Sequence, residues 1–484
     1  MDAGFKPVLL VTDVLFLGLI VLGVAGAWWA RRQPHLLASW QKVGESRSAM
    51  AAATILGVFL VVGVLDSLHY RPRLPDAPGQ TEARYGVEVL SVLDAVCAPL
   101  RNRMEKTYSA PLDYQLFAKE TLEMPDGTQQ RDFPRLKFGG AGLAEPARDW
   151  ATDVATRGAA GLVAGAVLWL FVSVGVITAV ARRARMGVAQ VVGQIWQGRW
   201  PLAWEGVLAV LALVCAFGGV AWGLAGAYHV LGTDKVGQDV LFLTLKSVRT
   251  ALVIGTITTL VTLPLAIALG LLAGYFGGWV DDVIQYVYTV LNSIPGVLLI
   301  AAAVLMMQVV IDTHPDWFAT AAERADARLT ALCFILGLTS WTGLCRLLRG
   351  ETLKLRELEY VQAAQAFGVS GGRIMVRHIL PNLMHIVMIA LVMDFSGLVL
   401  AEAVLSYVGI GVDPNTTSFG TMINAARLEL AREPMVWWSL ASAFVFMFVM
   451  VLAANLLADR VRDAFDPRYQ GAGPSRRLHR EGAR

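Results

Sequence analysis

Residues 359–368 read Glu-Tyr-Val-Gln-Ala-Ala-Gln-Ala-Phe-Gly, and residues 378–382 read His-Ile-Leu-Pro-Asn. In a helix, Tyr360, Ala364 and Phe367 would share one face, because residues three and four positions apart are neighbours. The alanines beside them would keep part of that surface flat. We therefore predict a short helix here, with small side chains that let a partner approach the backbone closely.

A tight turn is predicted directly after this helix. Gly368 suits the left-handed conformation that follows many helix ends, and Ser370 can cap a second short helix that runs to Leu380. Pro381 would separate this second helix from the apolar run that follows. Residues 351–382 would then form a compact helix-turn-helix knob. Spacing alone also allows an alternative, a plain positively charged linker.

The rest of the chain is unusually apolar. Of its 484 residues, 56% are hydrophobic and 16% are charged, and the mean hydropathy is +0.54. Ordinary soluble domains contain about 45–50% apolar and about 25% charged residues, so this composition indicates a membrane protein. We predict an all-α polytopic fold with about nine transmembrane helices, each long enough to cross roughly 30 Å of hydrocarbon. The apolar runs are 8–29, 50–68, 159–181, 204–227, 250–274, 284–310, 329–347, 383–407 and 435–457.

Basic residues are concentrated in alternate loops. They lie in 31–47, 182–199 and 346–377, and in the tail after Asp459. The positive-inside rule then predicts that these loops and the C-terminus face the cytoplasm and that the N-terminus lies outside. The net charge of +3 is too small to indicate a nucleic-acid partner.

Residues 69–157 are polar and are expected to form a small extracytoplasmic domain. Apolar residues between Val89 and Met104 recur at helical spacing, and Pro125-Asp126-Gly127 signals a turn, so the second half is expected to be irregular or to contain short hairpins. A segment of this size builds only a modest core and needs a surface to pack against. The expected division of the chain is 1–68 for two transmembrane helices with a cytoplasmic loop, 69–157 for this domain, 158–203 for the third transmembrane helix and a linker, 204–458 for a six-helix core with the knob, and 459–484 for a cytoplasmic tail.

Three pairs of glycines are spaced four residues apart within apolar runs. They are 161/165, 219/223 and 270/274. Such pairs let two helix backbones approach closely in a membrane bundle, although this spacing also arises by chance.

The stretch 359–382 resembles the EAA loop of ABC importer permeases, and it is most similar to the second, C-type permease subunit of the oligopeptide, dipeptide and nickel branch. Gly368 matches the glycine of that motif, while Gln362 stands where the general motif has its first Glu. The resemblance covers 229–470 and implies a six-helix type I importer core, to which three N-terminal spans and the extracytoplasmic domain are added. The other matching segments, in the expected order, are 229–241, 274–282, 293–295, 402–420 and 461–467.

Partners and localisation follow from this resemblance. It implies a homologous permease subunit, two cytoplasmic ABC ATPase subunits and an extracytoplasmic substrate-binding protein, assembled in the lipid bilayer of a bacterial cytoplasmic (inner) membrane. The chain has no phosphate-binding Gly-x-x-x-x-Gly-Lys-Ser/Thr loop, so it is expected to be a non-catalytic transport subunit, with ATP and Mg²⁺ bound by the ATPase chains and no cofactor of its own. Peptides fit this branch best as substrate, although nickel, glutathione and oligosaccharides use similar permeases.

The resemblance also implies that the knob couples the permease to the ATPase. Tyr360 and Phe367 would be its apolar anchors, and Arg373 or Arg377 would meet acidic groups on the ATPase or else remain solvated charges. The expected coupling residues are Glu359, Tyr360, Gln362, Ala363, Ala364, Phe367, Gly368, Arg373, Arg377, His378, Leu380 and Pro381.

Polar residues within the core runs are candidates for the translocation pathway, because charge in hydrocarbon is costly. Asp394 and Glu402 lie eight residues apart and can share a helix face, either lining a pathway or pairing with another span. Asn292 and Ser293, just before Pro295, mark a possible kink.

Some features of the sequence are also compatible with other functions. An ion-coupled secondary transporter could use Asp394 and Glu402 as proton or sodium sites, and a membrane sensor could use residues 69–157. Residues 368–372 match the hydrolase Gly-x-Ser-x-Gly pattern, but that elbow belongs in a soluble α/β sheet. The histidines lack the spacing of a zinc site, so no metal is expected.

Overall fold

The computed structural model describes residues 5–74, 84–123, 129–198, 200–413 and 416–465. Within them, nine helical segments are long and apolar enough to cross a membrane, which confirms the predicted number. The segments are α1 (Val11–Ala30), α3 (Arg47–Ser67), α6 (Pro146–Ala184), α8 (Trp204–Ala225), α9 (Val240–Phe276), α11 (Gly296–Thr313), α12 (Ala321–Arg356), the continuous Gly371–Val408, and α17 (Trp438–Phe465).

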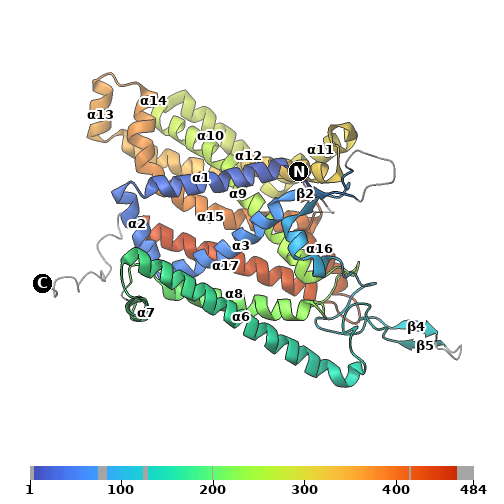
Figure 1. The fold of residues 1–484 in the computed structure, drawn as a ribbon. Helices are drawn as coiled ribbons and strands as arrows, with labels where there is room; N and C mark the ends of the chain where they lie inside the picture. The colour runs from blue at the N-terminus through green and yellow to red at the C-terminus, as the bar shows by residue number, and fades with distance from the viewer. Residues whose placement is uncertain (1–4, 75–83, 124–128, 199, 414–415, 466–484) are drawn as a thin grey trace.

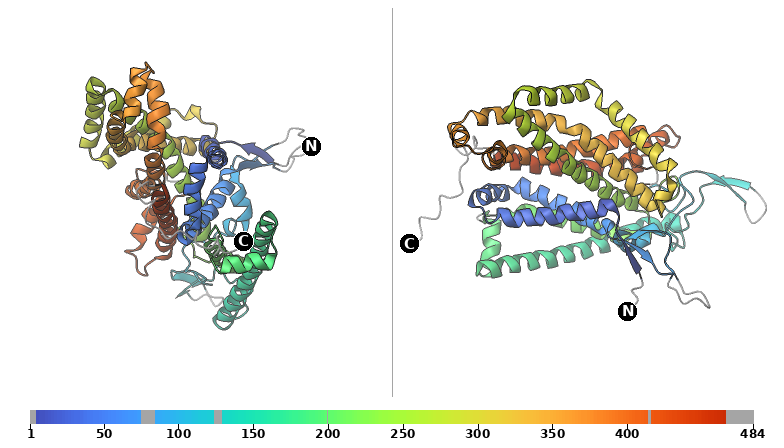
Figure 2. Two further views of the ribbon diagram at one scale, coloured as in Figure 1. Left: turned by 90° about the vertical axis from the view of Figure 1, so that its left-hand side faces the viewer. Right: turned by 90° about the horizontal axis from the view of Figure 1, so that it is seen from above.

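The long helices lie side by side, and the connecting elements gather at their two ends (Figure 1). One end carries α2 (Pro34–Glu45), α7 (Val188–Trp196) and α13 (Glu359–Ala366). The opposite end carries the strands and α16 (Phe419–Glu429). The basic loops therefore share one end of the molecule, as their alternation predicted. Seen from above, α1, α3 and α6 lie to one side of α15 and α17 (Figure 2).

One predicted span is not a single helix. The run 284–310 is divided between α10 (Gly278–Ser293) and α11, with Ile294 extended at φ −91° and ψ 131°. Pro295 precedes the first residue of α11, and a residue before proline is driven out of the helical region, which is the reason for the break. The kink expected around Asn292 and Ser293 is thus a complete interruption.

All three predicted glycine pairs lie where helices approach closely. In α6 and α8, a Cβ added to Gly161 or Gly165 would overlap backbone carbonyl oxygens of the other helix, and one added to Gly219 would overlap that of Gly161. In α9, a Cβ on Gly274 would lie 2.5 Å from Thr352 Cβ on α12. The small residues therefore set the spacing of both helix pairs.

The segment 69–157, which the sequence predicts to be extracytoplasmic, is divided into short elements. The apolar residues at helical spacing lie in two short helices, α4 (Val92–Val96) and α5 (Ala98–Arg101), separated at Cys97. Pro99 lies at the start of α5, where it cannot donate the hydrogen bond needed to continue α4. The expected hairpin is present as β4 (Glu120–Glu123) paired with β5 (Gln129–Asp132), and the turn at Pro125–Gly127 lies outside the described residues.

The chain before α1 joins this segment. An antiparallel sheet is formed by β1 (Phe5–Val8), β2 (His69–Pro72) and β3 (Leu90–Ser91). The expected boundary at 157/158 falls inside α6, which starts at Pro146 and continues without interruption. A short 3-10 turn, η1 (Pro315–Trp317), precedes α12 at the same end of the molecule.

The segment 69–157 packs against the membrane-spanning helices, as its small size predicted. Leu93, Cys97 and Leu100 form a buried cluster with Ala221 of α8 and Leu241 and Phe242 of α9. Trp438, at the start of α17, is buried, and its ring meets that of Phe117 edge to face, with the ring centres 4.8 Å apart. These contacts hold the segment firmly on one end of the bundle.

Candidate functional site

The knob between α12 and α15 (Leu380–Val408) is held from inside by apolar side chains. α13 ends at Ala366, and Gly368 has φ +77°, the left-handed turn that its sequence predicted. Val361 and Ile374 are fully buried and belong to one apolar cluster with residues of α9, α12 and α15. The turn is thus fixed to the long helices on both sides.

The outer surface of the knob carries two exposed aromatic side chains. The side chain of Phe367 is 87% exposed and that of Tyr360 is 44% exposed, while Ala363 is exposed and Ala364 half-buried. Because the Phe367 ring is so exposed, it makes few packing contacts with its own chain and adds little to the stability of the fold. It is available to a pocket on another protein.

Polar contacts align the two arms of the knob. Asn382 donates from Nδ2 to Tyr360 Oη at 3.1 Å and to the His378 carbonyl oxygen at 2.7 Å. The Tyr360 and His378 rings lie 6.4 Å apart. Gln362 donates to the Glu357 carbonyl oxygen at 3.3 Å, so its neutral side chain serves the local turn and makes no salt bridge.

The second arm differs from the prediction. Ser370 stands at the N-cap of α14 (Gly371–Ile374), but its side chain makes no capping hydrogen bond. Pro381 does not separate a short helix from the span, because helix continues from Gly371 to Val408. The chain widens into a π-turn, η2 (Met375–Ile379), just before Pro381, and a wider turn accommodates a residue that has no N–H to donate.

Two charged residues lie on the solvent side of this arm. Arg373 and Arg377 are exposed, and no hydrogen bond or ion pair to an acidic side chain joins either of them within the described ranges. Glu359, at the start of α13, is exposed as well. Leu380 is half-buried and continues the helix.

Tyr275 is not among the predicted coupling residues, although it lies in the segment 274–282 that resembles the family. Gln365 donates to Tyr275 Oη at 3.3 Å, and Arg356 donates to the Tyr275 carbonyl oxygen at 3.1 Å. A Cβ on Gly371 would lie 2.8 Å from the Tyr275 ring, so glycine is needed there for close approach. The C-terminal end of α9 therefore packs against the knob and helps to hold it in place.

An ion pair braces the base of the knob. Arg349 of α12 donates to both carboxylate oxygens of Asp281 on α10, at 2.5 and 2.6 Å. The Asp281 side chain also accepts from Gln285 at 2.9 Å. Bidentate pairs fix orientation as well as distance, so this ion pair holds α10 and α12 together below the knob.

The pathway candidates lie in different surroundings. Asn292 accepts a hydrogen bond from Thr342 of α12 at 3.1 Å, and Ser293 donates to its own helix at Val290. Asp394 is half-buried on α15 and has no hydrogen-bond or ion-pair partner in the described part of the chain. Glu402 is 1% exposed.

Glu402 joins two elements of this same chain. Its carboxylate accepts from Ser406 at 2.6 Å and from Ser418, the N-cap of α16, at 2.9 Å. Glu402 and Asp394 therefore share α15 without sharing a site. The hydrogen bond from Ser418 to Glu402 holds the start of α16 against α15.

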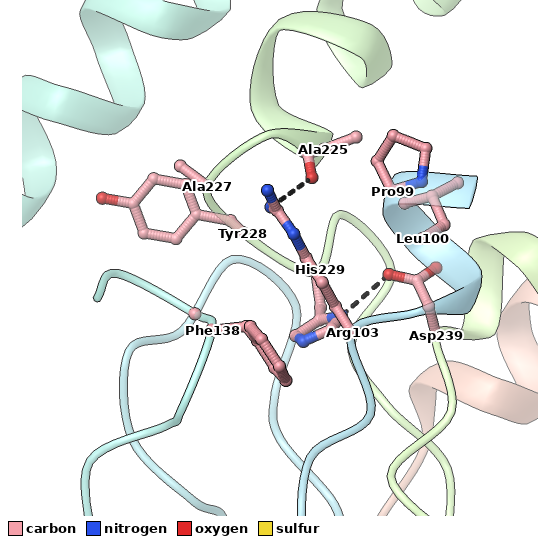
Figure 3. Close-up of a pocket in the computed structure, with 10 residues that line it drawn as sticks. Pro99, Leu100, Arg103, Phe138, Ala225, Ala227, Tyr228, His229 and Asp239 are labelled. Atoms are coloured by element: carbon pink, nitrogen blue, oxygen red, sulfur yellow. Dashed lines mark hydrogen bonds and ion pairs between the residues drawn. The ribbon is translucent and has the colours of Figure 1, made fainter. Parts of the chain in front are cut away.

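A small hollow is lined by residues of α5, of the loop between α8 and α9, and of the chain around Phe138 (Figure 3). Its wall includes Arg103, which donates to the Ala225 carbonyl oxygen at 3.0 Å, and His229, whose Nδ1 lies 2.8 Å from Asp239. None of the predicted site residues lines it. His229 Nε2 also lies 3.5 Å from Glu105, whose carboxylate accepts from three backbone N–H groups.

Charge stabilises this buried cluster. Burial alone would lower the pKa of His229, but the Asp239 and Glu105 carboxylates outweigh it and raise the pKa to about 9. Burial would raise the pKa of Glu105, but His229 and the backbone N–H groups lower it to about 2. At neutral pH the cluster therefore contains an imidazolium between two carboxylates.

Comparison with known proteins gives consistent matches. The family model described as "Binding-protein-dependent transport system inner membrane component" matches residues 266–471. The oligopeptide transport system permease protein OppC of Mycobacterium tuberculosis is 34% identical over 242 residues, which are 50% of this chain and 77% of OppC. The glutathione transport system permease protein GsiD of Pectobacterium atrosepticum is 33% identical over 50% of this chain and 73% of GsiD.

A solved structure was also matched. The MetNI methionine ABC transporter in an inward facing conformation covers 47% of this chain and 97% of its own, at 16% identity and a TM-score of 0.36. A score this low does not allow the two folds to be compared. The family model begins at residue 266, so α1, α3, α6 and α8 lie outside the part of the chain that it matches.

Proposed function

Because the chain belongs to the family of binding-protein-dependent transport system inner membrane components, we propose that it forms half of a translocation pathway that ATP hydrolysis on partner chains drives. The partners would be a second permease subunit, two cytoplasmic ATPase subunits and an extracytoplasmic binding protein. ATP and Mg²⁺ would bind to the ATPase subunits, since this chain has no phosphate-binding loop.

The exposed Phe367 on a rigid knob is the observation that carries this proposal. Its ring is 87% exposed, while Val361 and Ile374 beneath it are fully buried. A pocket on the ATPase would bind this ring. The knob that carries the ring lies next to the ion pair between Arg349 and Asp281, which joins α12 to α10. ATPase closure would then tilt α12 and α15 and alternate access to the pathway.

Charge supports the same docking mode. Arg373 and Arg377 are exposed near Phe367 in the chain and are not paired with acidic residues of the described ranges. Acidic groups around the ATPase pocket would pair with them and fix the orientation of docking.

The substrate is proposed to be a peptide. The relatives OppC, DppC and GsiD are named for the transport of oligopeptides, dipeptides and glutathione. All three cargoes are peptides with charged termini. Asp394 is the pathway residue that we propose on this chain, because its carboxylate is half-buried without a partner in the described ranges and is free to meet a cationic group of the cargo.

Membrane orientation follows from charge. The end that carries α2, α7 and α13 also carries the arginine-rich loops. We propose that this end faces the cytoplasm and that the β4–β5 end faces outward, with the N-terminus outside and the C-terminus inside.

A site-specific crosslinker tests the docking surface. A photoreactive phenylalanine analogue at position 367 of the assembled complex is expected to give an adduct with the ATPase subunit. The same analogue at Val87, which is 83% exposed at the opposite end, serves as the matched control. An ATPase adduct from position 87, or none from position 367, contradicts the proposal.

A further inference from the structure

The short helix α7 lies across the ends of the membrane helices and not along them (Figure 2). It connects α6 to α8 and consists of nine residues, Val188–Trp196. It lies at the same end of the molecule as α13, in the part of the chain that the family model does not reach. Neither the knob nor the pathway uses it.

One side of α7 packs on the bundle. Val191 and Ile195 are buried in a cluster with Ile177 of α6 and Trp204 of α8. This contact fixes the rotation of the helix. The other residues of α7 therefore face a defined direction.

A second apolar stripe lies beside this buried side and is left uncovered. Val188, Val192 and Trp196 follow at four-residue spacing and are 47%, 41% and 86% exposed. The glutamines Gln190 and Gln194 occupy the opposite side of the helix. α7 is thus amphipathic. Its apolar face includes the buried residues that pack on the bundle and also the exposed stripe beside them.

Positive charge borders the stripe. Arg182 and Arg183 end α6, and Arg185 follows it in a left-handed conformation at φ 53°. All three side chains are exposed, and within the described ranges none forms an ion pair with an acidic group. The patch therefore suits an anionic partner.

The bilayer is the partner that fits both features. The helix before α7, α6, has an apolar outer face of its own, where Phe171 is 80% exposed and Val174 57% exposed. A helix that lies at the end of membrane spans, with a tryptophan at its own end, is in the position of an interfacial helix. Arginines beside such a helix attract anionic lipid headgroups.

We propose that α7 is an interfacial anchor: Val188, Val192 and Trp196 insert at the boundary of headgroups and acyl chains, and Arg182, Arg183 and Arg185 bind anionic phospholipid headgroups. This anchor would fix α6 and α8 at the membrane surface. It does not depend on the transport cargo or on the docking of the knob.

Spin-label accessibility tests the insertion. A nitroxide is placed at position 192, or at Gln190 as the matched control, in the assembled complex with Cys215→Ala, because the other three cysteines are buried. The complex is reconstituted in nanodiscs of phosphatidylcholine with about a third phosphatidylglycerol, an anionic lipid. The label at 192 is expected to be reached by oxygen more than by a water-soluble nickel reagent, and the label at 190 by nickel more than by oxygen.

Two outcomes overturn the proposal. One is nickel access at 192 equal to that at 190, which means that the stripe faces water. The other is a label at 192 shielded from both reagents only when the ATPase subunits are present, which means that the stripe docks a protein.

Headgroup binding is tested separately on the same complex. Native mass spectrometry is expected to show fewer bound phosphatidylglycerol molecules when Arg182, Arg183 and Arg185 are all changed to Gln, with affinity falling about fivefold per arginine. The control changes two exposed arginines at the opposite end, Arg131→Gln and Arg148→Gln. Equal phosphatidylglycerol retention by the two variants contradicts a site at α7.

Discussion

Arg249 of α9 donates from Nη2 to Asp13 Oδ1 of α1 at 2.5 Å, across 236 positions of the chain. Arg249 also donates to Ser67 of α3, and Asp13 lies 2.7 Å from His69 Nδ1 of β2. A single guanidinium therefore joins two of the three N-terminal spans to a core helix. The added spans are part of the bundle and not a loosely attached extension.

Removing one charge of this pair should destabilise the complex. Asp13 is fully buried, so Asp13→Asn removes the carboxylate that accepts the charged hydrogen bond of Arg249 and is expected to cost about 3–5 kcal/mol. Thermal unfolding of the purified complex measures this loss. Asp282→Asn, a change at an exposed carboxylate, is the control, and equal melting of the two variants contradicts the role of the pair.

The helix contact between α6 and α8 should not tolerate a larger residue. Gly165→Leu places a side chain against the carbonyl of Cys215 and is expected to cost about 1–3 kcal/mol. Gly175→Leu lies on the same helix with nothing within 4 Å of its added Cβ, so its stability should match wild type. Thermal unfolding of the two variants, compared side by side, tests the contact.

Attachment of the segment 69–157 to the helix bundle should depend on pH. The pKa of His229 is raised to about 9, so its contribution is complete below its ordinary value of about 6.5 and is lost as the pH rises through 9. The pKa of Glu105 is lowered to about 2, so its contribution is complete above its ordinary value of 4.5 and is lost as the pH falls toward 2. Attachment is expected to be strongest between about pH 4.5 and 6.5.

Proteolysis of the segment measures this dependence. Cleavage within residues 84–123 should accelerate from pH 7 to pH 9.5 in the wild type. His229→Gln should be cleaved faster at neutral pH and should show a smaller change over that interval. An unchanged alkaline profile in this variant would assign the effect to other groups.

Asp394 should affect transport without affecting assembly. Its carboxylate has no partner in the described ranges, so Asp394→Asn breaks no contact there, but it removes a negative charge from the proposed pathway. We expect uptake of a peptide with a free amino terminus to fall several-fold, while ATPase co-purification stays normal. Uptake equal to wild type would exclude a role for this carboxylate.

The sequence predicted the spans because a run of apolar residues is a local signal. It predicted a kink at Asn292 and Ser293, but it did not predict that the helix would stop there, because only Pro295 marks the point where Ile294 becomes extended. Nor did it predict that helix would continue through Pro381, because a π-turn compensates for the missing donor.

The knob was largely predictable, and its surroundings were not. Gly368 adopts the turn that its position indicated. The contacts of Tyr275 with Gln365 and Arg356, and the ion pair between Asp281 and Arg349, join residues far apart in the chain. No periodicity connects such residues, so only the fold shows them. Glu402 likewise meets Ser418 through the fold of the loop after α15.

The most direct test of the coupling role is peptide uptake together with substrate-stimulated ATPase activity, measured on the reconstituted complex carrying Phe367→Glu. An acidic side chain at this exposed position should prevent docking without disturbing the buried anchors Val361 and Ile374. We expect both activities to fall at least tenfold, corresponding to about 1.4 kcal/mol, while Val87→Glu leaves them unchanged. Full uptake and full stimulation in the Phe367→Glu complex would contradict the account.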